Sequence, residues 1–214
     1  MVALGVAVVG GNRVGFDDGV VEVSMIFIGI DPGKHGAVVA LDGDSKFIRA
    51  WDQPLVEVGK TKGKTKKTAY DEQGMRRVIA ECLDMDAAPH HCPDVKACME
   101  NVHPMPKEGA VGAFTFGLGC GLWRGVMIGL QVPYQLVVPQ VWARAMQLGA
   151  TGKDAKERSV AVASRLWPGL DLSLKKHHDR AQAALIAEYG RRLWMGVQVS
   201  KAESTETDYE KAWS

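Results

Sequence analysis

Apolar runs of strand length follow one another along the first half of the chain, separated by short turn signals. The run "MIFIGI" begins at Met25 and ends in Asp-Pro-Gly, a sharp turn signal. Residues 36–44 and 46–52 predict two further strands, and turn-length links between such runs favour an antiparallel meander. Residues 94–102 and 134–138 predict a fourth and a fifth strand.

Helical spacing appears between and after these strands. Residues 71–85 place Met75, Val78, Ile79 and Leu83 on one side of a helix. The glycine-rich but apolar residues 104–130 predict a loop followed by a buried helix. Further helices are expected at 139–148, 154–167 and 178–194. The pattern predicts an α/β fold, a five-stranded mixed sheet flanked by helices.

The 214 residues have room for one sizeable domain. We expect an N-terminal extension of uncertain status at 1–24, the domain at 25–196 and a polar tail at 197–214. No run of about 18 apolar residues exists, so we expect no membrane span. The four cysteines form no C-x-x-C pair, which favours free thiols in a reducing, cytoplasmic setting.

The net charge of +1 conceals a basic middle section. Residues 1–24 and 201–214 each carry a net charge of −2, which leaves +5 on residues 25–200. Five lysines lie close together in the segment "GKTKGKTKK": Lys60, Lys62, Lys64, Lys66 and Lys67. Such a segment is either a solvated loop or a contact to a phosphate backbone.

Three acidic residues lie at the ends of apolar elements. Asp31 ends the first predicted strand, Glu100 lies near the end of the fourth, and Asp179 opens the last helix. If the two strands are neighbours, their carboxyl ends bring Asp31 and Glu100 together. Hard divalent cations take oxygen ligands, and two such ions can assist hydrolysis of a phosphodiester. Solvent exposure or turn capping is the alternative explanation for each acid.

Three segments carry a resemblance to a known family. "FIGIDPGKHGAVVAL", "MENVHPMP" and "KKHHDRAQAALIAEYG" resemble, in order, the three active-site motifs of RuvC-type Holliday junction resolvases, especially the phage and chloroplast variants. The resemblance covers roughly residues 26–194. It implies a ribonuclease H-like fold, two Mg²⁺ or Mn²⁺ ions per active site, and a homodimer. Such a dimer nicks a four-way DNA junction symmetrically.

The resemblance also assigns roles to individual residues. Asp31, Glu100 and Asp179 match the metal-binding carboxylates, and His178 matches a histidine that approaches the scissile phosphate or the attacking water. The family has one more acid where this chain has Gln182. Because an amide offers a metal only a neutral oxygen, we expect weaker binding of the second ion. Gln182 is an inactivating change that traps uncut DNA, a natural variant, or an ordinary polar helix residue.

Further residues are expected to contact DNA. Phe114 and Phe116, in the loop after Glu100, resemble aromatic residues that stack on unpaired bases at the junction centre; a place in the core is the alternative. Lys60, Lys62 and Lys64 form the lysine-rich contact proposed above. Lys153 and Lys156 resemble a basic helix start that faces the DNA backbone. The glycine-rich helix is a candidate dimer face on resemblance alone.

Two other functions stay open at this point. One is a non-catalytic protein that binds four-way junctions with the same fold, which Gln182 favours. The other is a ribonuclease H acting on RNA–DNA hybrids, which would work as a monomer. A P-loop nucleotidase is excluded, because the required first glycine of that motif is replaced by Val58.

Overall fold

A five-stranded mixed sheet forms the centre of the molecule. The computed structural model describes residues 13–16, 19–22, 25–60, 66–84, 94–101, 109–146, 148 and 153–197. The sheet contains β3 (Met25–Asp31), β4 (Ala37–Asp42), β5 (Phe47–Asp52), β8 (Asp94–Glu100) and β9 (Tyr134–Val137). Their spatial order is β5-β4-β3-β8-β9.

The pairing directions define the fold class. Strands β3, β4 and β5 form an antiparallel meander, whereas β8 pairs parallel to β3 and β9 pairs parallel to β8. A meander followed by two parallel strands on its other side is the ribonuclease H-like arrangement, so the predicted fold class is confirmed. The carboxyl ends of β3 and β8 therefore meet at the same edge of the sheet.

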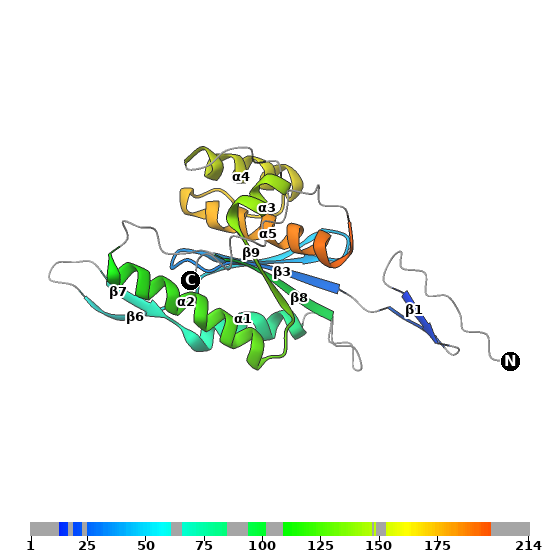
Figure 1. Cartoon of the computed structure of the whole chain (residues 1–214), viewed down its shortest axis with the longest axis horizontal. Helices are drawn as coiled ribbons and strands as arrows, with labels where there is room; N and C mark the ends of the chain where they lie inside the picture. Colours follow the sequence, from blue (N-terminus) through cyan, green and yellow to red (C-terminus); the bar gives the residue numbers. More distant parts are fainter. Residues whose placement is uncertain are drawn as a thin grey trace, which may run out of the picture.

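Helices cover both faces of the sheet (Figure 1). One face carries α1 (Glu72–Asp84) and α2 (Ala110–Gly129). The other carries α3 (Pro139–Ala145), α4 (Lys153–Leu166) and α5 (His178–Trp194), with a short 3₁₀ helix, η1 (Lys175–His177), directly before α5. Each face has its own core. Ile26, Ile28 and Ile30 pack toward α1 and α2, and Val39 and Leu41 pack toward α5.

Helix α5 approaches the sheet unusually closely. A Cβ atom added to Gly29 of β3 would lie 2.0 Å from the carbonyl oxygen of Ala183 and 2.3 Å from the amide nitrogen of Ala187. One added to Gly190 would lie 2.6 Å from Cβ of Cys98. The alanines of α5, together with these two glycines, let the helix lie directly on β3 and β8. This close contact determines the position of the first turn of α5 relative to the sheet.

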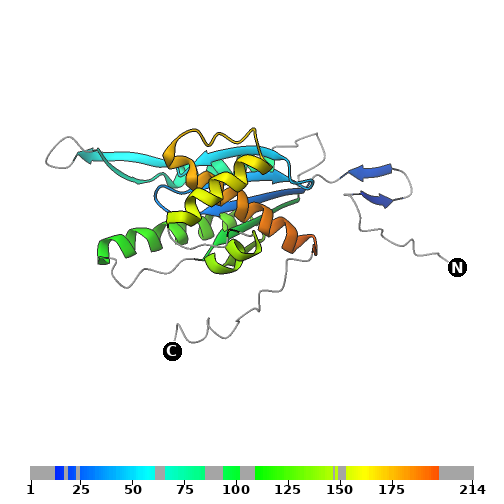
Figure 2. The same cartoon turned by 90° about the horizontal axis from the view of Figure 1, so that it is seen from above.

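The lysine-rich segment differs from the expected loop. The strands β6 (Leu55–Lys60) and β7 (Lys66–Tyr70) pair antiparallel in a hairpin that extends away from the main sheet (Figure 2). Strand pairing was missed because lysine and glycine disfavour strands in isolation. A second hairpin, β1 (Arg13–Phe16) and β2 (Gly19–Glu22), occupies part of the expected N-terminal extension.

Helix α2 is less buried than the sequence suggested. Only Gly119, Trp123 and Met127 of this helix are buried, so the expectation of a buried helix was wrong. Among the described residues, α2 alone is long and apolar enough to cross a membrane, judged by length and composition. The sequence pattern had predicted no such segment. Trp123 and Met127 belong to the core on this face of the sheet, which makes α2 a flanking helix of the domain.

Candidate active site

Two carboxylates from neighbouring strands lie at one edge of the sheet. The register pairs Ile30 of β3 with Met99 of β8, so Asp31 and Glu100 are the next residues of these parallel strands. Asp179 comes from the first turn of α5. Helix α5 crosses β3 where Ala183 lies against Gly29. Asp179 is four residues before Ala183, roughly 6 Å along the helix, and Asp31 is two residues after Gly29, a similar distance along the strand. The two carboxylates are therefore expected at the same end of the crossing.

The electrostatics indicate that the three carboxylates are close together. The pKa of Asp31 is raised to about 7, mainly by burial and in addition by the charges of Glu100 and Asp179, against the opposing effects of the Gly33 amide and Lys156. Burial also raises the pKa of Glu100 and of Asp179. The charges of His178, Lys156 and His35 oppose the effect of burial on Asp179, so the repulsion among the acids falls mainly on Asp31.

Each strand-end carboxylate is held by a different partner. The backbone amide of Gly33 donates to Asp31 Oδ1 at 3.2 Å. The indole Nε1 of Trp142, a buried residue of α3, donates to Glu100 Oε1 at 2.8 Å. These contacts orient the two acids before any ligand binds.

His178 links Asp179 to Lys156. Its Nε2 lies 2.8 Å from Asp179 Oδ1 and 2.8 Å from Lys156 Nζ. Its Nδ1 lies 2.8 Å from the carbonyl oxygen of Lys175, which can only accept, so Nδ1 carries a proton. In the neutral ring Nε2 is then the nitrogen without a proton, and it has one acidic and one basic neighbour.

Sequence analysis missed three residues at this site. Trp142 gave no signal, because its role depends on contact with a strand 42 residues away. His35 lowers the pKa of Asp179, which places it near that carboxylate; its position four residues after Asp31 was the available signal. Burial raises the pKa of the Cys120 thiol to about 11, with contributions from Asp31 and Glu100, so α2 also borders the site.

The site has the donor chemistry of a divalent-cation centre. Asp31, Glu100 and Asp179 supply hard oxygen donors, and the pKa of all three is raised, which suits Mg²⁺ or Mn²⁺. Among the described residues, no three histidine, cysteine or acidic side chains lie close enough together to coordinate one metal ion as they stand. Asp179 is instead turned toward His178.

Comparison with known proteins identifies a related enzyme. No protein-family model matches the chain. Over 88 residues, 40% of this chain, it is 36% identical to the chloroplastic Holliday junction resolvase MOC1 of Chlamydomonas reinhardtii. The expected resemblance to Holliday junction resolvases is confirmed. The match spans 10% of that relative's length.

Two solved structures of Thermus thermophilus RuvC are also similar to the chain. One is RuvC in complex with a Holliday junction substrate, with 17% identity and a TM-score of 0.48; it covers 80% of this chain and 96% of the other. The second, a structure of RuvC, has 17% identity and a TM-score of 0.44, covering 80% and 97%. The fold assignment rests on strand order and register.

The resolvase resemblance predicted further positions around this centre. Gln182 lies on α5, three residues after Asp179, and is partly buried. Lys156 contacts His178, as described above. Lys153 is the first residue of α4. Arg158, two residues after Lys156 on α4, donates to the carbonyl of Leu148 at 2.9 Å and so has a structural partner.

The remaining DNA-binding predictions have mixed outcomes. Phe114 and Phe116 lie in the first turns of α2, so their placement in a loop was wrong: glycine near 109–112 does not prevent the helix from beginning at Ala110. Phe114 is 72% exposed, which excludes a core role for it. Lys60 ends β6. Lys62 and Lys64 lie outside the described residues.

Proposed function

We propose that this protein is a metal-dependent endonuclease that resolves four-way DNA junctions by paired, symmetric nicks. The observation that carries the proposal is the convergence of Asp31, Glu100 and Asp179 at the shared edge of β3 and β8. The 36% identity to a Holliday junction resolvase supports the choice of substrate. We place the protein in a reducing compartment, either the cytoplasm of a bacterial or phage-infected cell or an organelle.

The three carboxylates would hold the metal, with Asp31 shared between two Mg²⁺ or Mn²⁺ ions. When bound, such ions activate a water molecule and stabilise the leaving oxygen of a phosphodiester. The raised pKa of Asp31 supports this assignment, because a cation bound there would relieve the repulsion among the three acids.

His178 is the candidate proton carrier. With Nδ1 held by the Lys175 carbonyl, Nε2 is able to accept a proton near the scissile phosphate, and Asp179 would stabilise the resulting imidazolium. Lys156, beside Nε2, would contribute positive charge toward the phosphate backbone. The products would be 5′-phosphate and 3′-hydroxyl ends.

Symmetric nicking requires two active sites, and α2 offers a face for a homodimer. Val111, Phe114 and Ile128 are 82%, 72% and 64% exposed along this helix. On the same side, Gly121 and Gly125 have open space where a side chain would be. An apolar stripe with small residues at its centre suits close packing against a second copy. Phe114, in the part of the stripe near the start of α2, would then lie near the junction centre.

A second function is favoured by one residue. Gln182 replaces an acid in the resolvase pattern, so a protein that binds four-way junctions without cutting them is the alternative. A monomeric ribonuclease H acting on RNA–DNA hybrids is the third possibility, and the exposed stripe on α2 argues against it.

A cleavage assay on a labelled four-way junction tests these functions. The chain and its Gln182→Glu variant are compared in Mg²⁺ and in Mn²⁺, with linear duplex and RNA–DNA hybrid as alternative substrates. Gln131→Glu, exposed in the turn between α2 and β9, adds the same charge at the opposite end of β9 from Val137, the residue that pairs with Glu100, and serves as the matched control. An Asp31→Asn change in the Gln182→Glu background shows whether any cut depends on the site.

Each outcome selects one function. Paired nicks made by Gln182→Glu, and abolished by Asp31→Asn, support the resolvase and an inactivating role for the amide. Cleavage by the unmodified chain supports a resolvase in which Gln182 is a natural variant. Tight junction binding without cleavage by either protein favours the non-catalytic binder, and cutting of the hybrid favours a ribonuclease H.

A further inference from the structure

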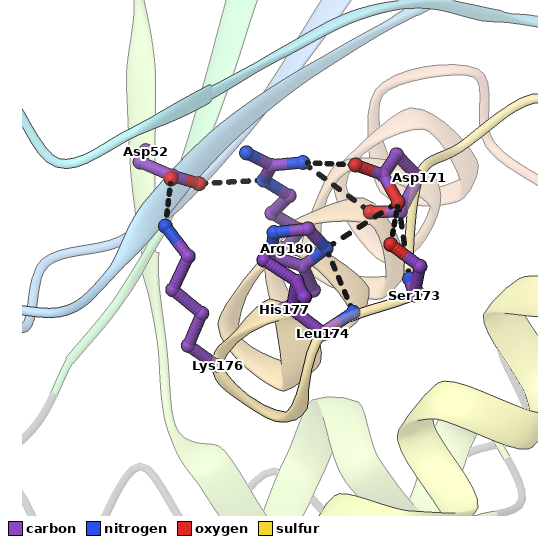
Figure 3. A network of polar contacts seen from close by, with 7 residues as sticks. All are labelled: Asp52, Asp171, Ser173, Leu174, Lys176, His177 and Arg180. Atoms are coloured by element: carbon purple, nitrogen blue, oxygen red, sulfur yellow. Dashed lines mark hydrogen bonds and ion pairs between the residues drawn. The ribbon is translucent and has the colours of Figure 1, made fainter.

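The carboxylate of Asp52, the last residue of β5, contacts one basic side chain just before α5 and another in its first turn. Asp52 Oδ1 accepts a hydrogen bond from Arg180 Nε, and Asp52 Oδ2 accepts one from Lys176 Nζ at 3.1 Å. Figure 3 shows both basic side chains reaching toward Asp52. These partners lie 124 and 128 residues away in the sequence, so the contact joins the edge of the meander to the last helix.

Arg180 is also held from the other side. Its Nη1 lies 3.3 Å from the carbonyl oxygen and 3.4 Å from the carboxylate of Asp171, in the segment before η1 (Figure 3). Asp171 in turn accepts hydrogen bonds from the backbone and hydroxyl of Ser173, and lies 3.5 Å from the buried His177. The Arg180 side chain is only 19% exposed, so its guanidinium is fixed rather than solvated.

This arrangement constrains the direction in which the first turn of α5 faces. Lys176 and Arg180 are four residues apart and share a partner, so both lie toward the β5 edge. His178, two residues from each of them, lies about half a turn around the helix from both, whereas Asp179 lies beside Arg180 and three residues after Lys176. His178 and Asp179 lie between these two contacts and are turned toward each other and toward Lys156. The two flanking ion pairs therefore set the rotation of the segment that carries the third carboxylate.

We propose that Asp52 is a positioning residue for the nuclease centre: through Arg180 and Lys176 it holds the first turn of α5 so that His178 and Asp179 face Asp31 and Glu100. The inference rests on the proposed function for its consequence, the assembly of a metal site. Asp52 itself touches none of the three carboxylates through a hydrogen bond or ion pair that the described residues show. Its charge does raise the pKa of Asp179, so the test has to separate this direct effect from positioning through the helix.

The test uses Mn²⁺ binding by the full chain, measured by titration calorimetry, together with hydrogen exchange of the backbone amides of residues 176–182. Asp52→Asn and Arg180→Gln each remove the ion pair between Asp52 and Arg180, but they change the net charge of the protein in opposite directions. Asp94→Asn is the matched control, because the Lys96–Asp94 pair has the same side-chain exposures, 19% and 44%, as the Arg180–Asp52 pair. It lies at the opposite end of β8 from Glu100.

If Asp52 positions the helix, both variants weaken Mn²⁺ binding, by roughly 10-fold as for other residues that support metal ligands, and both accelerate exchange at the start of α5. The double variant is then no weaker than the worse single variant, because both remove one interaction. The control behaves as the unmodified chain.

A direct electrostatic effect predicts a different pattern. Asp52→Asn would then weaken Mn²⁺ binding while Arg180→Gln would strengthen it, and this outcome overturns the proposal. Unchanged binding and exchange in both variants overturns it as well. If the unmodified chain binds no Mn²⁺, the proposed function fails, and amide exchange alone decides whether Asp52 holds the helix.

Discussion

The indole Nε1 of Trp142 donates a hydrogen bond to Glu100 Oε1 at 2.8 Å. Trp142 is 2% exposed, and its helix, α3, begins directly after β9, the strand next to Glu100's own strand. The core packing of an aromatic side chain is thereby used to hold a partly buried carboxylate at the edge of the sheet.

Replacing Trp142 by phenylalanine should weaken the metal site while keeping most of the packing. We expect roughly 10-fold weaker Mn²⁺ binding, because loss of a group that orients a ligand typically costs 10-fold or more. Loss of the hydrogen bond should lower the free energy of unfolding by about 1 kcal/mol. Calorimetric titration and urea unfolding measure the two effects.

Trp167→Phe provides the control for this change. Trp167 is 3% exposed and its Nε1 also donates at 2.8 Å, to the carbonyl of Ser45, away from the carboxylates. It should lose similar stability without a change in Mn²⁺ affinity. Equal losses of affinity in both variants would show that Trp142 acts through the core alone.

Stability should fall as the pH rises when no divalent ion is present. The Asp31 carboxyl has an ordinary pKa of 3.8 and a folded-state pKa of about 7. Between these values the folded protein binds more protons than the unfolded chain, so the stabilising contribution is complete below about pH 4 and is lost as the pH rises through 7. The upper limit for this contribution is about 4 kcal/mol.

Thermal unfolding in EDTA from pH 5 to pH 8 measures this dependence. Asp31→Asn should show a shallower decline and a higher Tm than the unmodified chain at pH 8, whereas Asp94→Asn should keep the original trend. Addition of Mg²⁺ should restore stability at pH 8 in the unmodified chain but not in Asp31→Asn. A decline of equal slope in Asp31→Asn would contradict the assignment.

The sequence predicted the main sheet because local signals there agree with the fold. The run from Met25 to Asp31 is strand-like on both faces, and buried strands between two helical layers need no alternation. Acids placed directly after such strands then predicted the position of Asp31 and Glu100. The start of α5 at His178 also matched.

The features that the sequence did not predict depend on contacts between distant segments of the chain. The contact of Asp52 with Arg180 spans 128 residues, and nothing in either local pattern announces it. The β6–β7 hairpin pairs two strands whose lysines and glycines individually favour a loop. Burial of α2 was overestimated because composition does not reveal how many sides of an apolar helix the domain covers.

The exposed stripe on α2 predicts the oligomeric state. Ile128→Glu places a charge in the stripe and should convert a dimer, twice 23.2 kDa, into a monomer. Multi-angle light scattering after size-exclusion chromatography gives the mass directly. Leu166→Glu, on α4 and 43% exposed, introduces the same change on the other face of the sheet and should remain dimeric. A monomeric unmodified chain would refute the dimer.

The β6–β7 hairpin predicts a salt-dependent contribution to junction binding. Lys66 and Lys67 are exposed and begin β7, a strand of the hairpin that extends from the sheet (Figure 2). Lys66 pairs with Glu57, so its charge is partly compensated in the free protein. Lys67→Gln should therefore weaken binding more than Lys66→Gln does. Removing one lysine that binds a phosphate should reduce the slope of log K against log salt concentration by about one.

Fluorescence anisotropy of a labelled four-way junction, titrated at several salt concentrations in EDTA, measures affinity and slope without cleavage. Lys46→Gln is the control, because Lys46 is a comparably exposed lysine in the β4–β5 turn with an acidic neighbour, Asp44. If the hairpin binds phosphate, Lys67→Gln lowers both affinity and slope while Lys46→Gln changes neither. Equal effects of the two would mean that the lysines act only through the net charge of the protein, and the hairpin would then have no specific role in binding.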